Sequence, residues 1–448
     1  MGVVPDERRL FGTDGVRGTV GDFLTADLAL ALGRAATAWV PAETPQVLLI
    51  RDTRESGEML EAALAAGIAE AGGHAMIAGV LPTPGAAMLA RRYGFDLACV
   101  VSASHNPYRD NGIKFFGSDG MKLPDAAEQE VESAVLAGEG LAPSPGRVRE
   151  LHGAGADYLR ELESRFQELE LSGVRVLLDC ANGATYRVGP EIFRRLGADV
   201  ETLATEPDGR NINEGCGSTH IEENLAEAVP AGGYDVGFAF DGDGDRVLAV
   251  DRGGALVDGD ELIALAAVHL RSAGRLPGNG VAVTVMTNYG FHSAMAGCGI
   301  EVATTPVGDR HVIAELMRRG WALGGEQSGH IIDTGFVPSG DGIASALLAL
   351  EALAGRDLAE RDAMTKLPQL LINVKVADRG GIDAAPAVQE AIERESAALE
   401  GRGRVLVRPS GTEPLIRVMV EAPDDTECHD VAERLADLVR RELGRAAL

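Results

Sequence analysis

VLLIRDTRESG, at residues 47–57, is a short apolar run that leads into a polar turn and then into a helical pattern. The same order recurs in VRVLLDCANGA at residues 174–184 and in VAVTVMTNYG at residues 281–290. A short apolar run that ends in a polar turn is typical of a buried strand before a helix. Three occurrences of this pattern predict three related strand–turn–helix units.

A second kind of strand follows in each unit and ends in a polar motif. The three sequences are DLACVVSASHNP from residue 96, YDVGFAFDGDGDR from residue 234 and WALGGEQSGH from residue 321. Each is an apolar run that breaks into a polar or glycine-rich turn. Ligands of open α/β sheets bind beyond the carboxyl ends of the strands. We therefore expect the three motifs to face one shared cleft.

The chain is too long for a single core, because its 448 residues exceed the roughly 100–200 residues of an ordinary domain. Alternating strand and helix patterns predict an α/β fold of three related domains with mixed, mostly parallel sheets. The last segment predicts a smaller C-terminal α+β domain. We expect the four domains to surround a central cleft, with bounds at residues 1–155, 156–255, 256–368 and 369–448.

The charge of the chain limits its partners. Its formal net charge is -27, from 68 acidic and 41 basic residues. A surface of this sign repels nucleic acid and anionic lipid headgroups, so we expect neither as a partner. It also repels phosphorylated metabolites. A phosphate ligand would therefore need a local group of cations, backbone N–H donors or a metal ion.

The spacing of the cysteines and the length of the apolar segments indicate the cellular compartment of the protein. The five cysteines form no C-x-x-C pair, which argues against a zinc site and against a disulfide framework. No apolar stretch approaches the roughly 20 residues that cross a membrane, and the first residues lack a signal-peptide pattern. We therefore expect a cytoplasmic protein with reduced thiols.

The motif DGDGDR, residues 241–246, places three carboxylates directly after an apolar run. Asp241, Asp243 and Asp245 alternate with glycines, which let the backbone curl so that the side chains converge. Converging carboxylates need a cation, and hard oxygen ligands favour Mg²⁺. A calcium EF-hand does not fit, because arginines stand at the sixth and twelfth positions of the loop. A solvated hairpin turn is the alternative.

The motif SASHNP, residues 102–107, follows another apolar run and places Ser104 beside His105. A serine at this position is a candidate nucleophile. An ordinary serine and asparagine turn is the alternative, and the hexapeptide alone favours it. The G-x-S-x-G pattern of an esterase is absent around Ser104.

The motif GEQSGH, residues 325–330, gathers Glu326, Ser328 and His330 within one turn. These side chains can hydrogen-bond sugar hydroxyls. His330 is also a candidate base, because the pKa of an imidazole lies near neutrality. A polar turn without a ligand is the alternative interpretation.

The motif RPSGTEP, residues 408–414, is a loop of small residues after an arginine. A guanidinium fork followed by short hydroxyl and N–H donors can surround a phosphate. The donors are Arg408, Ser410, Gly411 and Thr412, with Arg417 a little beyond. The loop is not a Walker A motif, since it lacks G-K-[ST]. A hairpin turn is again the alternative.

Two further cations lie in loops beside glycines. Arg17 belongs to FGTDGVRG at residues 11–18, and Lys114 belongs to NGIKFF at residues 111–116. Either side chain could face solvent. In so acidic a chain, however, cations of this kind are the residues expected to neutralise a phosphate.

Taken in this order, TDGVRG, SASHNP, DGDGDR, GEQSGH and RPSGTEP resemble the α-D-phosphohexomutase superfamily. The resemblance runs from about residue 10 to about residue 445. Members of this superfamily have four domains, of which three are related α/β units, which agrees with the repeats described above. The resemblance implies a phosphoryl transfer within a hexose phosphate.

The resemblance also implies roles for individual residues. Ser104 would carry the phosphoryl group as a phosphoserine. Asp241, Asp243 and Asp245 would hold one Mg²⁺ together with a phosphoserine oxygen. The residues that would steady charge or transfer protons are Arg17, His105, Lys114, Arg246 and His330. The residues that would bind the substrate are Asp309, Glu326, Ser328, Arg408, Ser410, Gly411, Thr412 and Arg417.

Within the superfamily, GEQSGH, CANGATY, NEGCGSTH and VGDR look like the branch that acts on glucosamine phosphates. This implies interconversion of glucosamine 6-phosphate and glucosamine 1-phosphate, with glucosamine or glucose 1,6-bisphosphate as activator. The expected partner is a small hexosamine phosphate, and the chain is expected to be a monomer or a homodimer. A preference for glucose or mannose phosphates, a metal-dependent sugar phosphatase and a non-catalytic sugar-phosphate sensor stay open as alternatives.

Overall fold

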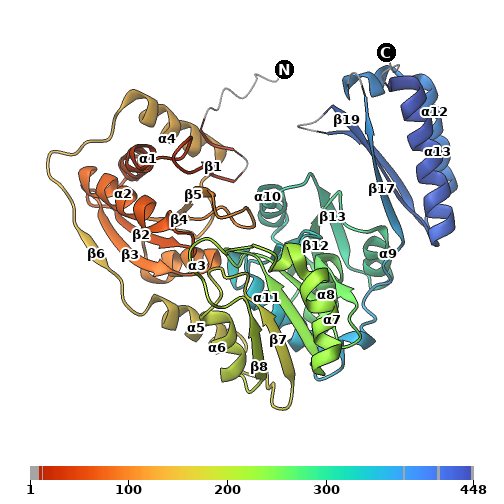
Figure 1. Ribbon diagram of the computed structural model, residues 1–448, viewed down its shortest axis with the longest axis horizontal. Coiled ribbons are helices and arrows are strands. Elements are labelled where there is room, and N and C mark those ends of the chain that lie inside the picture. Colours follow the sequence, from red (N-terminus) through yellow and green to blue (C-terminus); the bar gives the residue numbers. More distant parts are fainter. Residues whose placement is uncertain (1–9, 13, 377–378, 411–413, 445–448) are drawn as a thin grey trace. The chain divides into compact units, whose positions relative to one another are not determined.

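The computed structural model describes residues 10–12, 14–376, 379–410 and 414–444 (Figure 1). The chain divides into two compact units. The larger unit comprises Met1–Val285 and Ala303–Arg361, and the smaller unit comprises Met286–Val302 and Asp362–Leu448. Within the described ranges, no helix combines the length and the apolar character needed to cross a membrane.

The first sheet of the larger unit has six strands in the order β1-β5-β4-β2-β3-β6. Its strands are β1 (Val16–Thr19), β2 (Gln46–Arg51), β3 (His74–Val80), β4 (Leu97–Val101), β5 (Asp110–Gly117) and β6 (Val148–Glu150). Strands β4, β2 and β3 are parallel, whereas β4 and β5 form an antiparallel pair. The helices of this domain are α1 (Ala26–Trp39), α2 (Gly57–Glu70), α3 (Thr83–Tyr93) and α4 (Asp125–Ala137).

Two further sheets have the orders β11-β10-β9-β7-β8 and β13-β12-β14-β15-β16. The strands of the second sheet are β7 (Arg175–Asp179), β8 (Asp199–Leu203), β9 (Val236–Phe240), β10 (Val247–Asp251) and β11 (Leu256–Val257). Those of the third sheet are β12 (Gly280–Thr284), β13 (Glu301–Thr305), β14 (Leu323–Gly325), β15 (Ile331–Asp333) and β16 (Val337–Gly340). The helices are α5 (Ala154–Arg165), α6 (Val188–Arg195), α7 (Ile221–Gly232), α8 (Gly259–Ser272), α10 (Asp309–Arg319) and α11 (Gly342–Leu353).

The three sheets repeat one arrangement. The first strand of each repeat (β2, β7 or β12) lies between the second strand (β3, β8 or β13) and the third (β4, β9 or β14). The third strand is parallel to the first and then pairs with the next strand in the antiparallel sense. SASHNP and DGDGDR each follow a third strand directly, and GEQSGH begins at the last residue of β14. The three related α/β units expected from the repeats are therefore confirmed.

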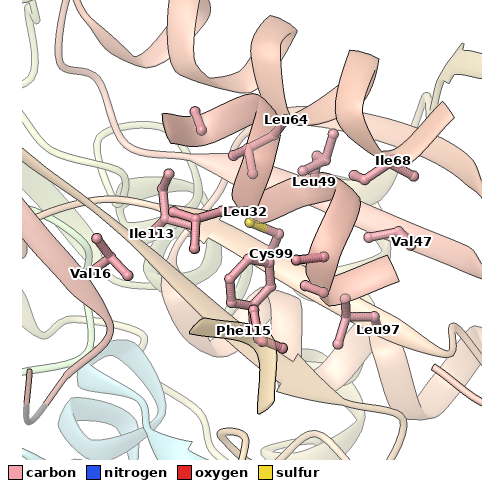
Figure 2. Packing of buried hydrophobic residues seen from close by; sticks show 14 of the residues in the cluster. Val16, Leu32, Val47, Leu49, Leu64, Ile68, Leu97, Cys99, Ile113 and Phe115 are labelled. Carbon is pink, nitrogen blue, oxygen red and sulfur yellow. The ribbon is translucent and has the colours of Figure 1, made fainter. Parts of the chain in front are cut away.

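Figure 2 shows the apolar core of the first α/β domain. Leu32 of α1 and Leu64 of α2 belong to one fully buried cluster with Leu49 of β2. The alternate residues Leu48 and Ile50 of β2 are also fully buried, although they point to the opposite face of the sheet. Both faces of β2 are thus covered, which explains the unbroken apolar run at the start of the first repeat.

Aspartates determine where two helices of the third α/β domain begin. The Asp258 carboxylate accepts hydrogen bonds from the backbone N–H groups of Asp260 and Glu261 at the start of α8, and the Glu261 carboxylate accepts one from Asp258 N in return. Asp341 accepts a hydrogen bond from Ala344 N at the start of α11. Such caps satisfy N–H groups that have no partner within the helix.

The smaller unit contains a three-stranded antiparallel sheet in the order β17-β19-β18. Its elements are β17 (Gln369–Lys375), β18 (Arg404–Pro409), β19 (Leu415–Glu421), α9 (Tyr289–Gly297), α12 (Pro386–Ala398) and α13 (Asp425–Leu443). Ile416, Val418 and Val420 alternate along β19 and belong to one buried cluster with Val431 and Leu435 of α13. The expected smaller C-terminal α+β domain is confirmed.

Candidate active site

The three polar motifs of the larger unit line one cleft of about 570 Å³. Ser104 comes from the first motif, Asp245 from the second, and Glu326 and His330 from the third. Four more residues expected at the site also line the cleft, namely Arg17, His105, Arg246 and Asp309. Motifs that lie far apart in the sequence are therefore neighbours in the fold.

Ser104 lies in the turn after β4 and contacts the second motif. Its backbone is left-handed, with a φ of 52°, which is uncommon for a residue with a side chain. Ser104 Oγ donates a hydrogen bond to Asp241 Oδ2 over 2.5 Å, and His105 Nδ1 lies 3.3 Å from the same Oγ. Ser104 is only 1% exposed. The turn therefore holds a buried hydroxyl against a carboxylate and is not an ordinary solvated turn.

Asp241, Asp243 and Asp245 form a buried group of carboxylates. One ligand oxygen from each lies within 4.8 Å of the others. Among the described residues, Asp243 Oδ1 and Asp245 Oδ1 are buried and have no hydrogen-bond partner. Buried carboxylate oxygens without a donor are unfavourable unless a cation binds them. The group is therefore suited to hold a divalent cation through oxygen ligands.

The surroundings of these three carboxylates differ. Burial, Asp245 and Asp243 together raise the pKa of Asp241 well above its usual value. Burial and Asp245 also act to raise the pKa of Asp243, but Lys114 and its other partners lower it overall. Burial acts to raise the pKa of Asp245, but His330 and its other partners lower it overall. Asp241 is therefore the carboxylate that most needs an additional cation.

The two glycines of DGDGDR have different tasks. We expected both to let the loop curl, but Gly244 is the one with a left-handed backbone, at a φ of 72°. A Cβ atom on Gly242 would lie 2.5 Å from the carbonyl oxygen of Ser104. Gly242 is thus required because the second motif passes directly over the backbone of the first.

We expect Gly242→Ala to lower the midpoint of thermal unfolding by about 2–6 °C, because the added methyl group must displace backbone. Gly155→Ala in α5 is the matched control. The nearest atom to a Cβ on Gly155 lies 3.7 Å away, so this substitution should leave the midpoint unchanged or raise it. Differential scanning calorimetry measures both, and an unchanged midpoint for Gly242→Ala would contradict the close approach.

Lys114 on β5 is a structural cation of the site. It is 1% exposed, and its Nζ lies 3.1 Å from Asp14 Oδ2 and 3.0 Å from Asp243 Oδ2. Burial lowers the pKa of Lys114, but Asp14 and Asp243 raise it more, so it lies above its usual value. Lys114 therefore keeps its proton. It is suited to neutralise carboxylates, and its expected role in proton transfer stays a prediction.

Lys122 and Asp14 line the cleft but were not among the residues expected there. Lys122 Nζ pairs with Asp14 of the first domain and lies 2.6 Å from Asp309 Oδ2 at the start of α10. Lys122 stands near Gly120 in a loop, so the rule that selected Arg17 and Lys114 also selects Lys122. The side chain joins two walls of the cleft.

The two histidines of the cleft are shifted in opposite directions. Burial lowers the pKa of His330, but Asp245 raises it more, and its Nδ1 lies 3.5 Å from Asp245 Oδ1. Burial and Arg246 lower the pKa of His105. His105 is therefore the neutral imidazole of the pair, and His330 is the one that more readily carries a proton.

The remaining expected residues of the larger unit are Arg17, Arg246, Glu326 and Ser328. Arg17 pairs with Asp14, and Arg246 Nε lies 3.8 Å from Asp245 Oδ1. Glu326 Oε1 accepts a hydrogen bond from Gly308 N over 2.9 Å. These three expected residues present charge to the cleft. Ser328, by contrast, is exposed in its turn, and its contact with a sugar stays a prediction.

The phosphate loop expected in the smaller unit begins at a pair of arginines. Arg408 on β18 lies directly opposite Arg417 on β19. Like charges at opposite positions of a strand pair repel each other, so an anion between them would be favourable. Ser410 is buried at the end of β18. Gly411 and Thr412 lie outside the described residues.

Comparison with known families covers most of the chain. Profiles of phosphoglucomutase/phosphomannomutase match residues 8–140 as alpha/beta/alpha domain I, 152–254 as domain II, 258–370 as domain III and 371–438 as the C-terminal domain. The matches follow the order of the three sheets and the smaller unit.

Individual relatives are similar over nearly their full length. A phosphoglucosamine mutase of Desulforudis audaxviator is 51% identical and aligns over 96% of this chain and 97% of its own. One of Heliobacterium modesticaldum is 49% identical over 97% and 99%. The crystal structure of a phosphoglucomutase/phosphomannomutase family protein of Burkholderia thailandensis has a TM-score of 0.80 at 24% identity over 96% of both chains, which shows the same fold.

Proposed function

The chain belongs to the phosphoglucomutase/phosphomannomutase family, and we propose that it acts as a phosphoglucosamine mutase, which interconverts glucosamine 6-phosphate and glucosamine 1-phosphate. The observation that carries this proposal is the contact between Ser104 and Asp241. It joins a hydroxyl to a group of carboxylates suited to a metal, in a cleft lined by Arg17 and Arg246. The names of the relatives support glucosamine as the sugar.

Asp241, Asp243 and Asp245 fit a magnesium ion. Their oxygens are close together, and two of them have no hydrogen-bond partner among the described residues. Hard oxygen ligands of this kind are those that Mg²⁺ prefers, and phosphate oxygens complete its coordination in many enzymes. When bound, the ion neutralises charge on the phosphoryl oxygens during transfer.

We infer that Ser104 carries the phosphoryl group. The bond between phosphorus and Ser104 Oγ breaks as a bond forms to O1 of glucosamine 6-phosphate. The O1 proton passes to a base in the cleft, and Ser104 Oγ takes up a proton. The resulting 1,6-bisphosphate turns around. The bond between phosphorus and O6 then breaks as the 6-phosphoryl group returns to Ser104 Oγ. The serine proton passes to a base, O6 takes up a proton, and glucosamine 1-phosphate leaves. No phosphate is gained or lost over the cycle.

Four side chains in and beside the cleft have separate tasks in this cycle. His105 is the neutral imidazole beside Ser104 Oγ, so it can accept the serine proton when the phosphoryl group returns. Arg17 and Arg246 attract the phosphoryl oxygens, because they are cations on the wall of the cleft. Lys114 keeps Asp243 ionised. Most of the catalysis is therefore positioning and electrostatic stabilisation.

The arginines of the smaller unit would hold the phosphate that is not transferred. Arg408 and Arg417 stand side by side in register, which suits a dianion.

We expect the purified protein to form glucosamine 1-phosphate from glucosamine 6-phosphate in the presence of Mg²⁺ and a trace of glucose 1,6-bisphosphate. The kcat/KM should be at least about 10-fold higher than with glucose or mannose phosphates, because the sugar site must discriminate between a few polar groups. A coupled assay and phosphorus NMR measure both. Stoichiometric release of inorganic phosphate would contradict the proposal and would instead indicate a phosphatase.

A further inference from the structure

We propose that Arg54 and Asn213 are positioning residues that hold the phosphoryl-accepting serine in place from behind. They act on the Ser104 loop, which we define as residues 102–110. Neither residue lines the cleft. The proposal rests on the proposed function, since it concerns how Ser104 is aimed at its substrate.

Arg54 is among the largest fully buried side chains of the protein. It lies in the polar turn after β2, and its guanidinium group donates five hydrogen bonds. Nε donates to Asp52 Oδ2 over 2.8 Å, and the other four donate to the carbonyl oxygens of Ser104 (2.9 Å), Asn106 (2.8 Å), Pro107 (2.5 Å) and Asp110 (3.0 Å). A guanidinium has five N–H donors, so all of them are used.

Asp52 connects the same guanidinium to the backbone N–H of the serine. Asp52 Oδ2 accepts hydrogen bonds from Arg54 Nε and from Ser102 Oγ over 2.6 Å. Ser102 Oγ in turn accepts a hydrogen bond from Ser104 N over 2.9 Å. The peptide groups on both sides of Ser104 Cα are therefore tied to one buried ion pair.

Asn213 reaches the same loop from the second domain. Its Nδ2 donates to the carbonyl oxygens of Ser104 over 2.9 Å and Asn106 over 3.1 Å, which are two of the acceptors of Arg54. The second domain is held nearby by two contacts. Thr53 Oγ1 donates to Asn182 O in the turn after β7, and Glu55 N donates to Gly209 O in the loop that carries Asn213. Side chains of the first and second domains thus donate hydrogen bonds to the same two carbonyl oxygens.

The backbone conformation of Ser104 explains why the loop needs these hydrogen bonds. A left-handed φ is unfavourable for a residue with a side chain, so the loop needs contacts that outweigh the strain. The planar fork of arginine fits several carbonyl oxygens at once, whereas lysine offers three donors from a single atom. Arg54 and Asn213 therefore determine the direction of Ser104 Oγ, which lies on the other side of the loop against Asp241.

Arg54→Lys tests the proposal, with Arg51→Lys as its matched control. Arg51 is the last residue of β2, and its side chain pairs with Glu58 and Glu61 instead of the Ser104 loop. We expect Arg54→Lys to lower kcat by about 100-fold, because a displacement of about 1 Å of a reacting group has effects of this size. The KM should stay within about threefold, since the residue does not touch the substrate. Arg51→Lys should retain near wild-type kcat.

Hydrogen exchange measured by mass spectrometry gives a readout that does not depend on activity. In Arg54→Lys, amides of the Ser104 loop should exchange about 10-fold faster than in the wild type, because hydrogen bonds that order the loop are lost. Amides of β2 should be unchanged. Faster exchange over the whole domain would show that Arg54 is only a structural residue and would overturn the proposal.

Asn213→Ala provides a second test should Arg54→Lys fold poorly. It should accelerate exchange in the same loop and lower kcat more than it raises KM. The two variants should be non-additive when combined, because their donors share two acceptors. A wild-type protein without mutase activity would refute the proposed function, whereas an active wild type with fully active Arg54→Lys and Asn213→Ala variants would refute this inference alone.

Discussion

Ser104→Ala is expected to lower kcat for the formation of glucosamine 1-phosphate by about 10⁴-fold or more, the scale seen when a covalent nucleophile is removed. The reason is chemical. In the proposed cycle, Ser104 Oγ is the atom to which phosphorus is bonded between the two half-reactions, and alanine has no oxygen to replace it. The neighbouring His105 and Asp241 stay in place, so electrostatic stabilisation alone would remain.

Intact mass spectrometry supplies the second measurement. After incubation with glucose 1,6-bisphosphate and Mg²⁺, the wild type should gain the mass of one phosphoryl group, and Ser104→Ala should gain none. Ser133→Ala is the control, because Ser133 is an exposed hydroxyl on α4 that donates to Gln129 O. It should be labelled and active like the wild type. A Ser104→Ala variant with near wild-type turnover would exclude Ser104 as the phosphoryl carrier.

The order of the elements could be predicted because its signals are local. An apolar run, a polar turn and a helical pattern lie within about 20 residues, so β2, β7 and β12 were found from the sequence together with the strands that carry the motifs. The same holds for DGDGDR, because its three carboxylates occur at regular spacing. Their convergence in the structure needs little beyond Gly244 and the end of β9.

The contacts between motifs could not be predicted, because no local pattern states which turn of one domain meets which turn of another. Ser104 and Asp241 are 137 residues apart, and Lys122 and Asp309 are 187 apart. The requirement for Gly242 follows from one of these approaches and not from its own loop.

The sequence also did not reveal which polar side chains are buried. The sequence identifies the turn that contains Arg54 only as a polar turn, and arginines are seldom fully buried. In the fold, Arg54 and Asp52 are both fully buried and satisfy each other and the Ser104 loop. The same effect applies to Lys114, which reads as a cation for phosphate but is enclosed by carboxylates. The spacing of a motif shows which types of residue lie at a site. The role of each residue depends on the side chains that surround it in the fold.

Asp241→Asn is expected to separate metal binding from folding. Among the described residues, no side-chain cation lies within ion-pair distance of Asp241, whereas Asp243 is paired with Lys114 and Asp245 lies near His330. Phosphorylation of Ser104 would add up to two negative charges beside Asp241, because Ser104 Oγ is 2.5 Å from its carboxylate. A cation is therefore needed most at this position.

We expect Mg²⁺ to raise the midpoint of thermal unfolding of the wild type, since a ligand that binds only the folded state stabilises it, and to raise it more when Ser104 is phosphorylated. In Asp241→Asn this rise should be lost and kcat should fall by about 10³-fold. With a chelator present, the variant should be at least as stable as the wild type, because a buried carboxylate without a cation has been removed.

The control is Asp235→Asn, an exposed residue directly before β9, which should retain the response to Mg²⁺. A midpoint in Asp241→Asn that still rises with Mg²⁺ as in the wild type would mean that the ion binds elsewhere, and the role of the three aspartates would have to be abandoned.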